Sequence, residues 1–302
     1  MHTILLTGAK GFFGQAILKA LSQEKGYRIK TADHKTYDLS KIDRAMAACK
    51  NVDIVIHAAG LVLSRIEQNL RPSEVIFQNV VPAINIAEAA KAQGVKKLIF
   101  ISSITAYPKS SKALKEEDLW KGSPQGDMPY GYAKRMADII ATAYSKAYGI
   151  KTCCAIFPNL YGPHDKYNFN PPPLVASAVK QLSVAKRKKL KEFFAGDNGH
   201  MPIDLLYIDD AAQAIKLLLK QASPPSLINI GTGKSVKIAQ VFALVAKNLG
   251  FNGKITWKAS KAKVTDERCL NVDLMKKALK WRPKVDLALG VKLTVKDFLK
   301  QS

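Results

Sequence analysis

The sequence predicts an α/β protein with a doubly wound parallel sheet, because strand-like and helix-like segments alternate through its first hundred residues. Segments 52–57 and 97–102 are mostly apolar, as in strands covered by helices on both faces of a sheet. Beyond about residue 158 the alternation loosens, and the prolines at 171–173 interrupt regular structure. We therefore expect a smaller α+β lobe in the C-terminal part.

Local patterns give the expected elements in order. Ile17, Leu18 and Leu21 form the apolar face of a first helix, and Gly94 is a stop signal for a second. The expected strands are 3–7, 27–32, 52–57, 97–102 and 227–230. The expected helices are 15–23, 82–93, 174–186, 209–219 and 238–249.

Composition excludes several classes of protein. With 47% hydrophobic and 24% charged residues in 302, the chain can build a sizeable core and is not disordered. It has no apolar run near the roughly 18 residues of a membrane span, and its first residues lack a signal-peptide pattern. We expect no membrane span and a cytoplasmic protein. Four cysteines without C-x-x-C spacing and five scattered histidines predict neither disulfides nor a metal site.

The formal net charge is +23, from 47 Lys and Arg against 24 Asp and Glu. Such a charge could suit a nucleic-acid binder. However, 39 of the cations are lysines and only 8 are arginines, and arginine is the better fork for phosphates and base edges. The densest basic run, 186–191, has no aromatic residue on which bases could stack. We expect a solvated basic surface and no nucleic-acid partner.

Three glycines form a G-x-x-G-x-x-G loop between the first expected strand and the first expected helix. This is the context in which a glycine-rich loop binds a dinucleotide in a Rossmann fold. Gly8 makes the tight turn, Gly11 lets a diphosphate approach the backbone, and Gly14 lets the helix pack on the sheet. The helix N-terminus adds N–H groups and a positive dipole. The expected cofactor-binding residues here are Gly8, Lys10, Gly11, Phe12, Phe13 and Gly14.

This loop determines the predicted domain organisation. Residues 1–165, joined by about 205–232, are expected to form a Rossmann dinucleotide-binding domain. Residues 166–204 and 233–302 are expected to form the substrate-binding lobe.

Asp33 closes the second expected strand. A carboxylate there can accept both hydroxyls of the adenosine ribose, which favours NAD over NADP. NADP is the alternative, because three nearby cations could neutralise a 2′-phosphate: Lys10, His34 and Lys35. Asp33 could also be only a turn residue. Asp38 and Leu39 follow at a position where they could cap the adenine edge.

A candidate catalytic group lies in the segment 129–134, which contains Y-x-x-x-K. On a helix, Tyr130 and Lys134 share one face. A cation beside the phenol would lower its pKa, so that Tyr130 could exchange a proton with a substrate oxygen while Lys134 holds the nicotinamide ribose. Ser103 lies at the end of the fourth expected strand, where ligands bind in doubly wound sheets.

Together these residues resemble the extended short-chain dehydrogenase/reductases, which are nucleotide-sugar epimerases, dehydratases and reductases. Segments 57–60, 102–108, 158–165, 207–210 and 229–233 add to the match, and 158–165 is most similar to the GDP-L-fucose synthase branch. The resemblance implies the catalytic residues Ser103, Tyr130 and Lys134. It also implies cofactor contacts at Ala58, Ala59, Tyr130 and Lys134, substrate contacts at Thr105 and Asn159, and a nucleotide-sugar substrate. We expect a homodimer.

The departures from the family pattern narrow the expected reaction. Family dehydratases carry Asp-Glu directly after the catalytic Ser or Thr, and this chain has Ile104 and Thr105 there. Fucose synthases use a Cys and a later His to epimerise C3 and C5; Thr105 occupies the Cys position, and segment 171–174 has no His. The usual Arg before Asp-Asp is replaced by Ile203, which leaves Arg268 as the expected diphosphate contact.

The resulting hypothesis is an NAD(P)-dependent enzyme acting at C4 of a nucleotide sugar, as a 4-ketoreductase or a 4-epimerase, without the 3,5-epimerase pair. Two alternatives stay open at this point. One is a reductase or dehydrogenase of a hydrophobic ketone or alcohol, and the other is a non-catalytic dinucleotide sensor.

Overall fold

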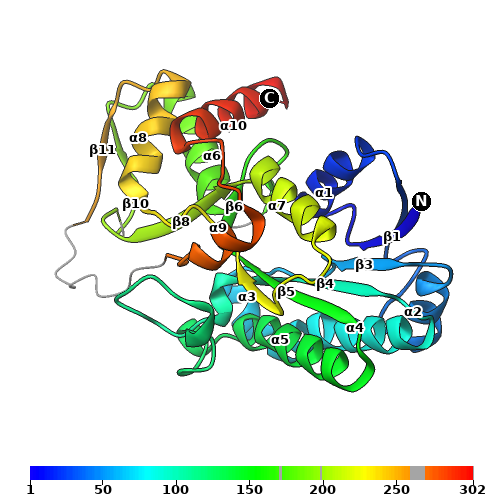
Figure 1. The fold of residues 1–302 in the computed structure, drawn as a ribbon. Coiled ribbons are helices and arrows are strands. Elements are labelled where there is room, and N and C mark those ends of the chain that lie inside the picture. Colours follow the sequence, from blue (N-terminus) through cyan, green and yellow to red (C-terminus); the bar gives the residue numbers. More distant parts are fainter. Residues whose placement is uncertain (170–171, 198, 259–268, 302) are drawn as a thin grey trace.

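The computed structural model describes residues 1–169, 172–197, 199–258 and 269–301. At its centre lies a six-stranded sheet of order β2-β1-β3-β4-β5-β9, in which every pair of neighbours is parallel (Figure 1). The chain builds outward from β1 in one direction to β2, and then in the other direction from β3 onward. The strands are β1 (His2–Thr7), β2 (Tyr27–Ala32), β3 (Ile54–His57), β4 (Lys97–Ser103), β5 (Lys151–Phe157) and β9 (Leu227–Asn229).

Helices cover both faces of this sheet (Figure 1). On one face α1 packs against α7, and on the other α4 lies between α2 and α5. Apolar strands that are buried on both faces require this double covering, so the predicted doubly wound fold is confirmed. The helices are α1 (Phe12–Ser22), α2 (Ile42–Cys49), α3 (Arg65–Leu70), α4 (Pro72–Ala92), α5 (Pro129–Tyr148) and α7 (Ile208–Lys220).

Helix α4 corrects one expectation. The sequence pattern predicts a helix over 82–93, but α4 begins ten residues earlier, with Pro72 at its first position, and Pro82 lies inside it. Pro82 lacks an N–H, so the helix loses one backbone hydrogen bond there. The ring of Pro82 is buried, and Val75, Ala83 and Ile86 are buried on either side of it. Burial of this apolar face therefore compensates for the hydrogen bond that is lost at Pro82, and the helix continues past the proline.

The C-terminal lobe is built on short strands and three helices. One small sheet has the order β10-β8-β6, and a second pairs β11 with β7. The strands are β6 (Asn159–Tyr161), β7 (Glu192–Phe194), β8 (Pro202–Tyr207), β10 (Ser235–Lys237) and β11 (Lys254–Thr256). The helices are α6 (Leu174–Arg187), α8 (Ile238–Leu249) and α10 (Leu287–Gln301).

Buried apolar side chains gather in two cores. The first surrounds the six-stranded sheet, and the second joins α6, α8 and α10 to β6 and β8. The short helix α9 (Asp273–Leu279) belongs to the first core through Met275 and Leu279, so part of the segment 233–302 packs beside the sheet. Among the described residues, no helix has the length and hydropathy of a membrane span.

Candidate active site

The expected cofactor segments meet at one edge of the sheet. Thr7, at the end of β1, is in register with Ala32 at the end of β2 and with His57 at the end of β3. The segments that begin at Gly8, Asp33 and Ala58 therefore start side by side. Doubly wound sheets bind ligands where the strand order reverses, which here is between β1 and β3.

The glycine loop forms a close-packed cradle at this point. Gly8 has φ +69°, and a Cβ there would lie 2.7 Å from the backbone nitrogen of Ala59. A Cβ on Gly14 would overlap the carbonyl oxygen of Gly8, to which the Gly11 N–H donates at 2.9 Å. Helix α1 begins at Phe12, three residues before its predicted start, so Gly14 lies in its first turn. The loop and the helix N-terminus fit a dinucleotide diphosphate, as the sequence predicts.

A polar contact that the sequence analysis missed holds the loop against β3. The Thr7 hydroxyl lies 3.0 Å from Nδ1 of His57 and accepts the Ala59 N–H at 3.1 Å. Burial, helped by the charge of Lys134, lowers the pKa of His57 to about 3, so the imidazole is neutral. Thr7 therefore fixes Ala58 and Ala59 beside Gly8 without adding a charge.

The other predicted cofactor residues have structural roles as well. The Phe13 ring packs edge-on against Phe157 at 4.9 Å between centroids, and Phe12 packs against the first core. The Asp38 carboxylate accepts the N–H and hydroxyl of Ser40, which lowers its pKa. Leu39 is buried.

Asp33 and Lys10 form an ion pair at the adenosine end of the predicted dinucleotide site. Oδ1 of Asp33 accepts the N–H groups of Lys35 and Thr36, and Oδ2 lies 2.8 Å from Nζ of Lys10. Bonding to Lys10 lowers the pKa of Asp33 to about 2. Asp33 is thus a turn residue that also presents a permanent negative charge beside the loop. The ion pair therefore joins Asp33, which would favour NAD, to Lys10, which could neutralise the 2′-phosphate of NADP.

This pair gives a first testable prediction. If Asp33 selects the ribose diol, NAD(H) binds more tightly than NADP(H), because a 2′-phosphate would meet the carboxylate. Asp33→Asn keeps an oxygen for the turn but removes the charge, so it should narrow or reverse the preference in fluorescence titrations. Lys10→Ala should weaken NADP(H) more than NAD(H). Tighter binding of NADP(H) by the unaltered protein would instead assign the selection to Lys10, His34 and Lys35.

Three contacts bring α5 against the end of β4. The Ser102 hydroxyl donates to the carbonyl oxygen of Lys134 at 2.8 Å. A Cβ on Gly131 would lie 2.6 Å from the carbonyl oxygen of Thr105, so the helix approaches the segment after β4 backbone to backbone. The buried Arg135 donates from Nε and Nη2 to the carbonyl oxygen of Ala106. These contacts place the start of α5, with Tyr130 and Lys134, beside the segment that carries Ser103.

The electrostatics of Tyr130 differ from the expectation. Nζ of Lys134 lies over the Tyr130 ring, 5.5 Å from its centroid, and donates to the carbonyl oxygen of Ile101 at 3.3 Å. Burial raises the pKa of Tyr130 and lowers the pKa of Lys134 to about 8. The expectation that the adjacent cation lowers the pKa of this phenol is wrong for this arrangement, because desolvation dominates. In this state Tyr130 is a protonated phenol, which suits a general acid.

Thr105 sets the direction in which Ser103 can donate. The Oγ of Ser103 accepts the Thr105 hydroxyl at 3.0 Å and the Thr105 N–H at 3.3 Å. Both contacts use acceptor capacity of the serine oxygen, which leaves its own O–H to donate elsewhere. Thr105, expected as a substrate contact, therefore also orients Ser103.

Asn79 is a further polar residue at this site. It lies on α4, is 6% exposed, and donates from Nδ2 to the carbonyl oxygens of Leu61 and Val75. Among the residues that the structure describes, its Oδ1 has no hydrogen-bond partner. A Cβ on Gly60 would lie 2.5 Å from this oxygen and 3.2 Å from Nζ of Lys134, so both groups border Gly60. The sequence pattern does not single out Asn79, because residue 79 precedes the predicted helix 82–93 and its burial follows from the longer helix α4.

On the substrate side, Asn159 is exposed at the start of β6 and donates to the carbonyl oxygen of Asp204 at 3.3 Å. Asp204 is fully buried, and its carboxylate accepts the Thr232 hydroxyl and the Leu270 N–H. Burial raises the pKa of Asp204 to about 7. These hydrogen bonds of Asp204 connect β8 to the segment after β9.

Arg268, the expected diphosphate contact, lies outside the described residues. Within those residues no cluster of His, Cys, Asp and Glu could hold a metal ion.

Comparisons with known proteins agree with this geometry. The model of the NAD dependent epimerase/dehydratase family matches residues 4–231. The GDP-L-fucose synthase of Sinorhizobium fredii is 31% identical over 301 residues, which cover 98% of this chain and 95% of that protein.

Two solved structures share the fold. A GDP-mannoheptose C4 reductase from Campylobacter jejuni with NADP bound has a TM-score of 0.87 at 20% identity, covering 99% of this chain and 98% of that one. The UDP-glucose 4-epimerase of Thermus thermophilus in complex with NAD has a TM-score of 0.81 at 23% identity, covering 99% and 100%. The predicted dinucleotide cofactor, NAD or NADP, agrees with these matches and with the glycine cradle. The chain belongs to the NAD dependent epimerase/dehydratase family, that is, to the extended short-chain dehydrogenase/reductases that its motifs resemble.

Proposed function

We propose that this enzyme transfers a hydride at C4 of a nucleotide-linked sugar, as a 4-ketoreductase or a 4-epimerase, and does not epimerise C3 or C5. The proposal rests on the position and the contacts of Thr105. Thr105 hydrogen-bonds Ser103 beside the Tyr130–Lys134 helix, at the position where fucose synthases carry a catalytic Cys. The names of the GDP-L-fucose synthase and the GDP-mannoheptose C4 reductase support a nucleotide-sugar substrate.

The roles of the residues follow from their contacts. The bound dinucleotide supplies or accepts the hydride, and the glycine cradle, Asp33 and Lys134 would hold it. In the direction of reduction, Ser103 donates a hydrogen bond to the C4 carbonyl oxygen. Tyr130 gives its phenolic proton to the same oxygen, and Lys134 stabilises the phenolate that remains. In the direction of oxidation, Tyr130 takes that proton back.

A panel assay tests this proposal. NADH or NADPH is incubated with the protein and 4-keto sugars linked to GDP, UDP or dTDP, and the absorbance of the reduced nicotinamide is followed. We expect turnover with at least one nucleotide-linked 4-keto sugar, or interconversion of C4 epimers with bound NAD. Turnover only with hydrophobic ketones, or cofactor binding without turnover, would favour one of the alternatives named above.

We also propose a homodimer formed through α4 and α5. Phe77 and Ile84 on α4, and Tyr132 and Ile139 on α5, are each spaced by seven residues, and all four are 39–49% exposed. Residues seven apart share one helix face, and the two helices lie side by side on the same outer layer (Figure 1). Paired with a second copy, this face would bury an apolar patch in a four-helix arrangement.

The dimer prediction can be checked by light scattering. Phe77→Asp places a carboxylate in the proposed interface, where burying an unpaired charge is costly. We expect the mass to fall from dimer to monomer. Leu299→Asp, at a 55% exposed position of α10, introduces the same charge elsewhere and should leave the dimer intact. A monomeric unaltered protein, or a dimeric Phe77→Asp variant, would contradict this interface.

The two hydrophobic cores support a division into two units, which we propose as a dinucleotide-binding domain over 1–165 with about 205–232 and a substrate lobe over 166–204 and 233–302; helix α9 of the lobe packs on the first core. The four cysteines are buried and take part in no disulfide of the described residues, which suits a reducing compartment such as the cytoplasm.

A further inference from the structure

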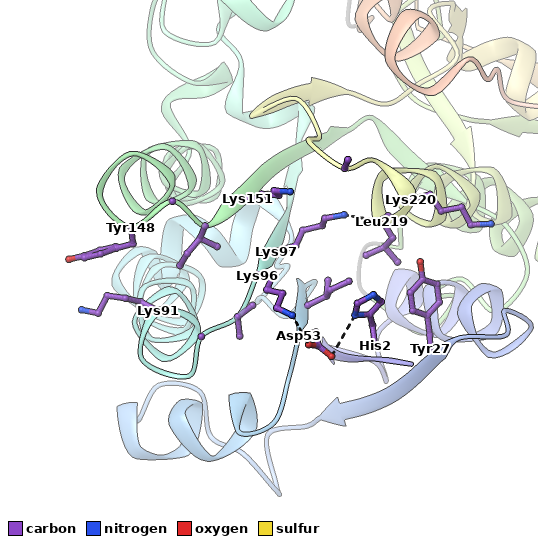
Figure 2. Close-up of a pocket in the computed structure, with 16 residues that line it drawn as sticks. His2, Tyr27, Asp53, Lys91, Lys96, Lys97, Tyr148, Lys151, Leu219 and Lys220 are labelled. Atoms are coloured by element: carbon purple, nitrogen blue, oxygen red, sulfur yellow. Dashed lines mark hydrogen bonds and ion pairs between the residues drawn. The ribbon is translucent and has the colours of Figure 1, made fainter.

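A cavity of about 710 Å³ opens at the N-terminal ends of the strands in the six-stranded sheet. The candidate active site lies at the opposite, C-terminal ends of these strands. Figure 2 shows that the lining of the cavity comes from the starts of strands and from the ends of helices α4, α5 and α7. Lys97, which lines the cavity, begins β4, whereas Ser103 ends it. At about 3.3 Å per residue the two positions are about 20 Å apart along the strand. The cavity is therefore separate from the dinucleotide and catalytic residues.

The lining is strongly cationic. It contains one carboxylate, Asp53, and five lysines: Lys91, Lys96, Lys97, Lys151 and Lys220. Three of these lysines have carboxylate partners. Lys96 lies 3.8 Å from Asp53, Lys91 lies 2.6 Å from Glu88, and Lys220 lies 2.9 Å from Glu24. Lys97 and Lys151 form no ion pair with any carboxylate of the described residues, and Figure 2 places them together in the centre.

Lys97 is a buried cation with hydrogen-bonding capacity to spare. Its side chain is 8% exposed, and Nζ donates to the carbonyl oxygens of Leu219 and Gln221 at 2.7 and 2.8 Å. An ammonium group has three N–H donors, so one is left for a ligand. Burial and the nearby charge of Lys151 lower the pKa of Lys97. The fold thus keeps the partly desolvated charge of Lys97 close to the charge of Lys151.

Strand register places these two lysines together. Lys97 and Lys151 are partners in the parallel β4–β5 pair, and like charges at directly opposite positions destabilise a sheet. Satisfying the carbonyl groups at the ends of α4 and α5 does not require these lysines. The N–H groups of Val95 and Gly149 already donate to Ala90 and Ser145 at 2.9 Å. Lys97 caps the end of α7 through the carbonyl oxygens of Leu219 and Gln221. Helix capping does not explain the presence of Lys151.

We propose that this cavity binds a diphosphate group, free or carried by a nucleotide, between Lys97 and Lys151. Its volume lies in the usual range of small-ligand sites, about 300–1,000 Å³. A diphosphate carries enough negative charge to offset both unpaired lysines and offers acceptors for the spare donor of Lys97. The ring of Tyr27 also lines the cavity and would contact the carried group of a nucleotide, whereas Figure 2 shows the ring of Tyr148 pointing outward.

Inorganic diphosphate is the direct probe. It is titrated by calorimetry, at fixed ionic strength, into protein whose dinucleotide site is saturated with cofactor. We expect Lys151→Glu to weaken binding at least tenfold. The new carboxylate can pair with Lys97, so the variant should unfold at a temperature no lower than the unaltered protein does without ligand. Lys180→Glu, at an exposed position of α6, makes the same charge change and should alter the affinity less than twofold.

Hydrogen exchange localises the site. Diphosphate should slow amide exchange in 94–97 and 149–152 of the unaltered protein, and not in Lys151→Glu. GDP or ADP that binds more tightly than diphosphate, with the same dependence on Lys151, would identify a nucleotide as the ligand; equal affinities would identify the free anion. Absence of binding in the unaltered protein, or equal binding by Lys151→Glu, would overturn the proposal. If that variant does not fold, Lys151→Gln makes the same comparison.

Discussion

Replacing Tyr130 by Phe is expected to lower turnover by about 10²–10⁴-fold, which is the usual contribution of a positioned acid or base. The phenol is half-buried on α5, and desolvation raises its pKa, so it holds a proton that the C4 oxygen needs during reduction. Phe fills the same space but has no proton to give. Affinity for the dinucleotide should change little, because the glycine cradle, Asp33 and Lys134 are untouched.

Tyr132→Phe is the matched control. Tyr132 lies two residues further along the same helix, is 41% exposed, and has no lysine four residues later. Turnover of this variant should stay close to that of the unaltered protein. Full activity in Tyr130→Phe would remove the phenol from the reaction and would favour a protein that only binds the dinucleotide.

Gly14→Ala is expected to lower dinucleotide affinity by about 100-fold, which corresponds to losing one or two backbone hydrogen bonds to the charged diphosphate at about 1.5–3 kcal/mol each. A Cβ on Gly14 would overlap the carbonyl oxygen of Gly8 and would lie 2.8 Å from Cα of Ala9. These are backbone atoms, so the whole loop must move away from α1. Titration of NADH fluorescence measures the loss.

Two variants separate binding from stability. Gly11→Ala is milder, because its Cβ would lie 3.2 Å from the Gly8 oxygen, and it should fold while still weakening the dinucleotide. Gly26→Ala has open space around it but a φ of +102°. It should cost stability and leave affinity unchanged. Unaltered affinity in Gly14→Ala would contradict the role of the cradle.

The sheet and the glycine loop could be predicted because their signals are local. Apolar strands such as 97–102 and the ordered spacing of Gly8, Gly11 and Gly14 depend on neighbours in sequence. Strand β2 and helix α8 have the predicted bounds. The start of α4 could not be found this way, because tertiary burial outweighs the cost of Pro82.

The site was only partly predictable for the same reason. Tyr130, Lys134 and Ser103 follow from motif and strand position, but their supports are long-range. Ser102 binds the backbone of α5 across 32 positions, and Arg135 binds Ala106 across 29. The raised pKa of Tyr130 depends on how deeply the folded chain buries the phenol. Sequence spacing places the lysine near the ring but does not give the desolvation.

Whether Thr105 confines the chemistry to C4 is the central question. Epimerisation beside a 4-keto group needs a base on one face of the sugar and an acid on the other. A threonine hydroxyl is too weakly acidic for this. Nδ1 of the exposed His164 lies 3.5 Å from the carboxylate of Asp297 on α10, and the backbone N–H of His164 donates to the same carboxylate, so these contacts hold the histidine beside α10.

The most direct measurement is deuterium incorporation. The protein is incubated in deuterated water with reduced cofactor and a GDP-linked 4-keto-6-deoxyhexose, and the recovered sugar is examined by NMR. We expect any enzyme-dependent change to be confined to C4, with no deuterium at C3 or C5 beyond the enzyme-free control. Enzyme-dependent exchange at C3 or C5 would contradict this expectation and would assign the protein a fucose-synthase type of reaction.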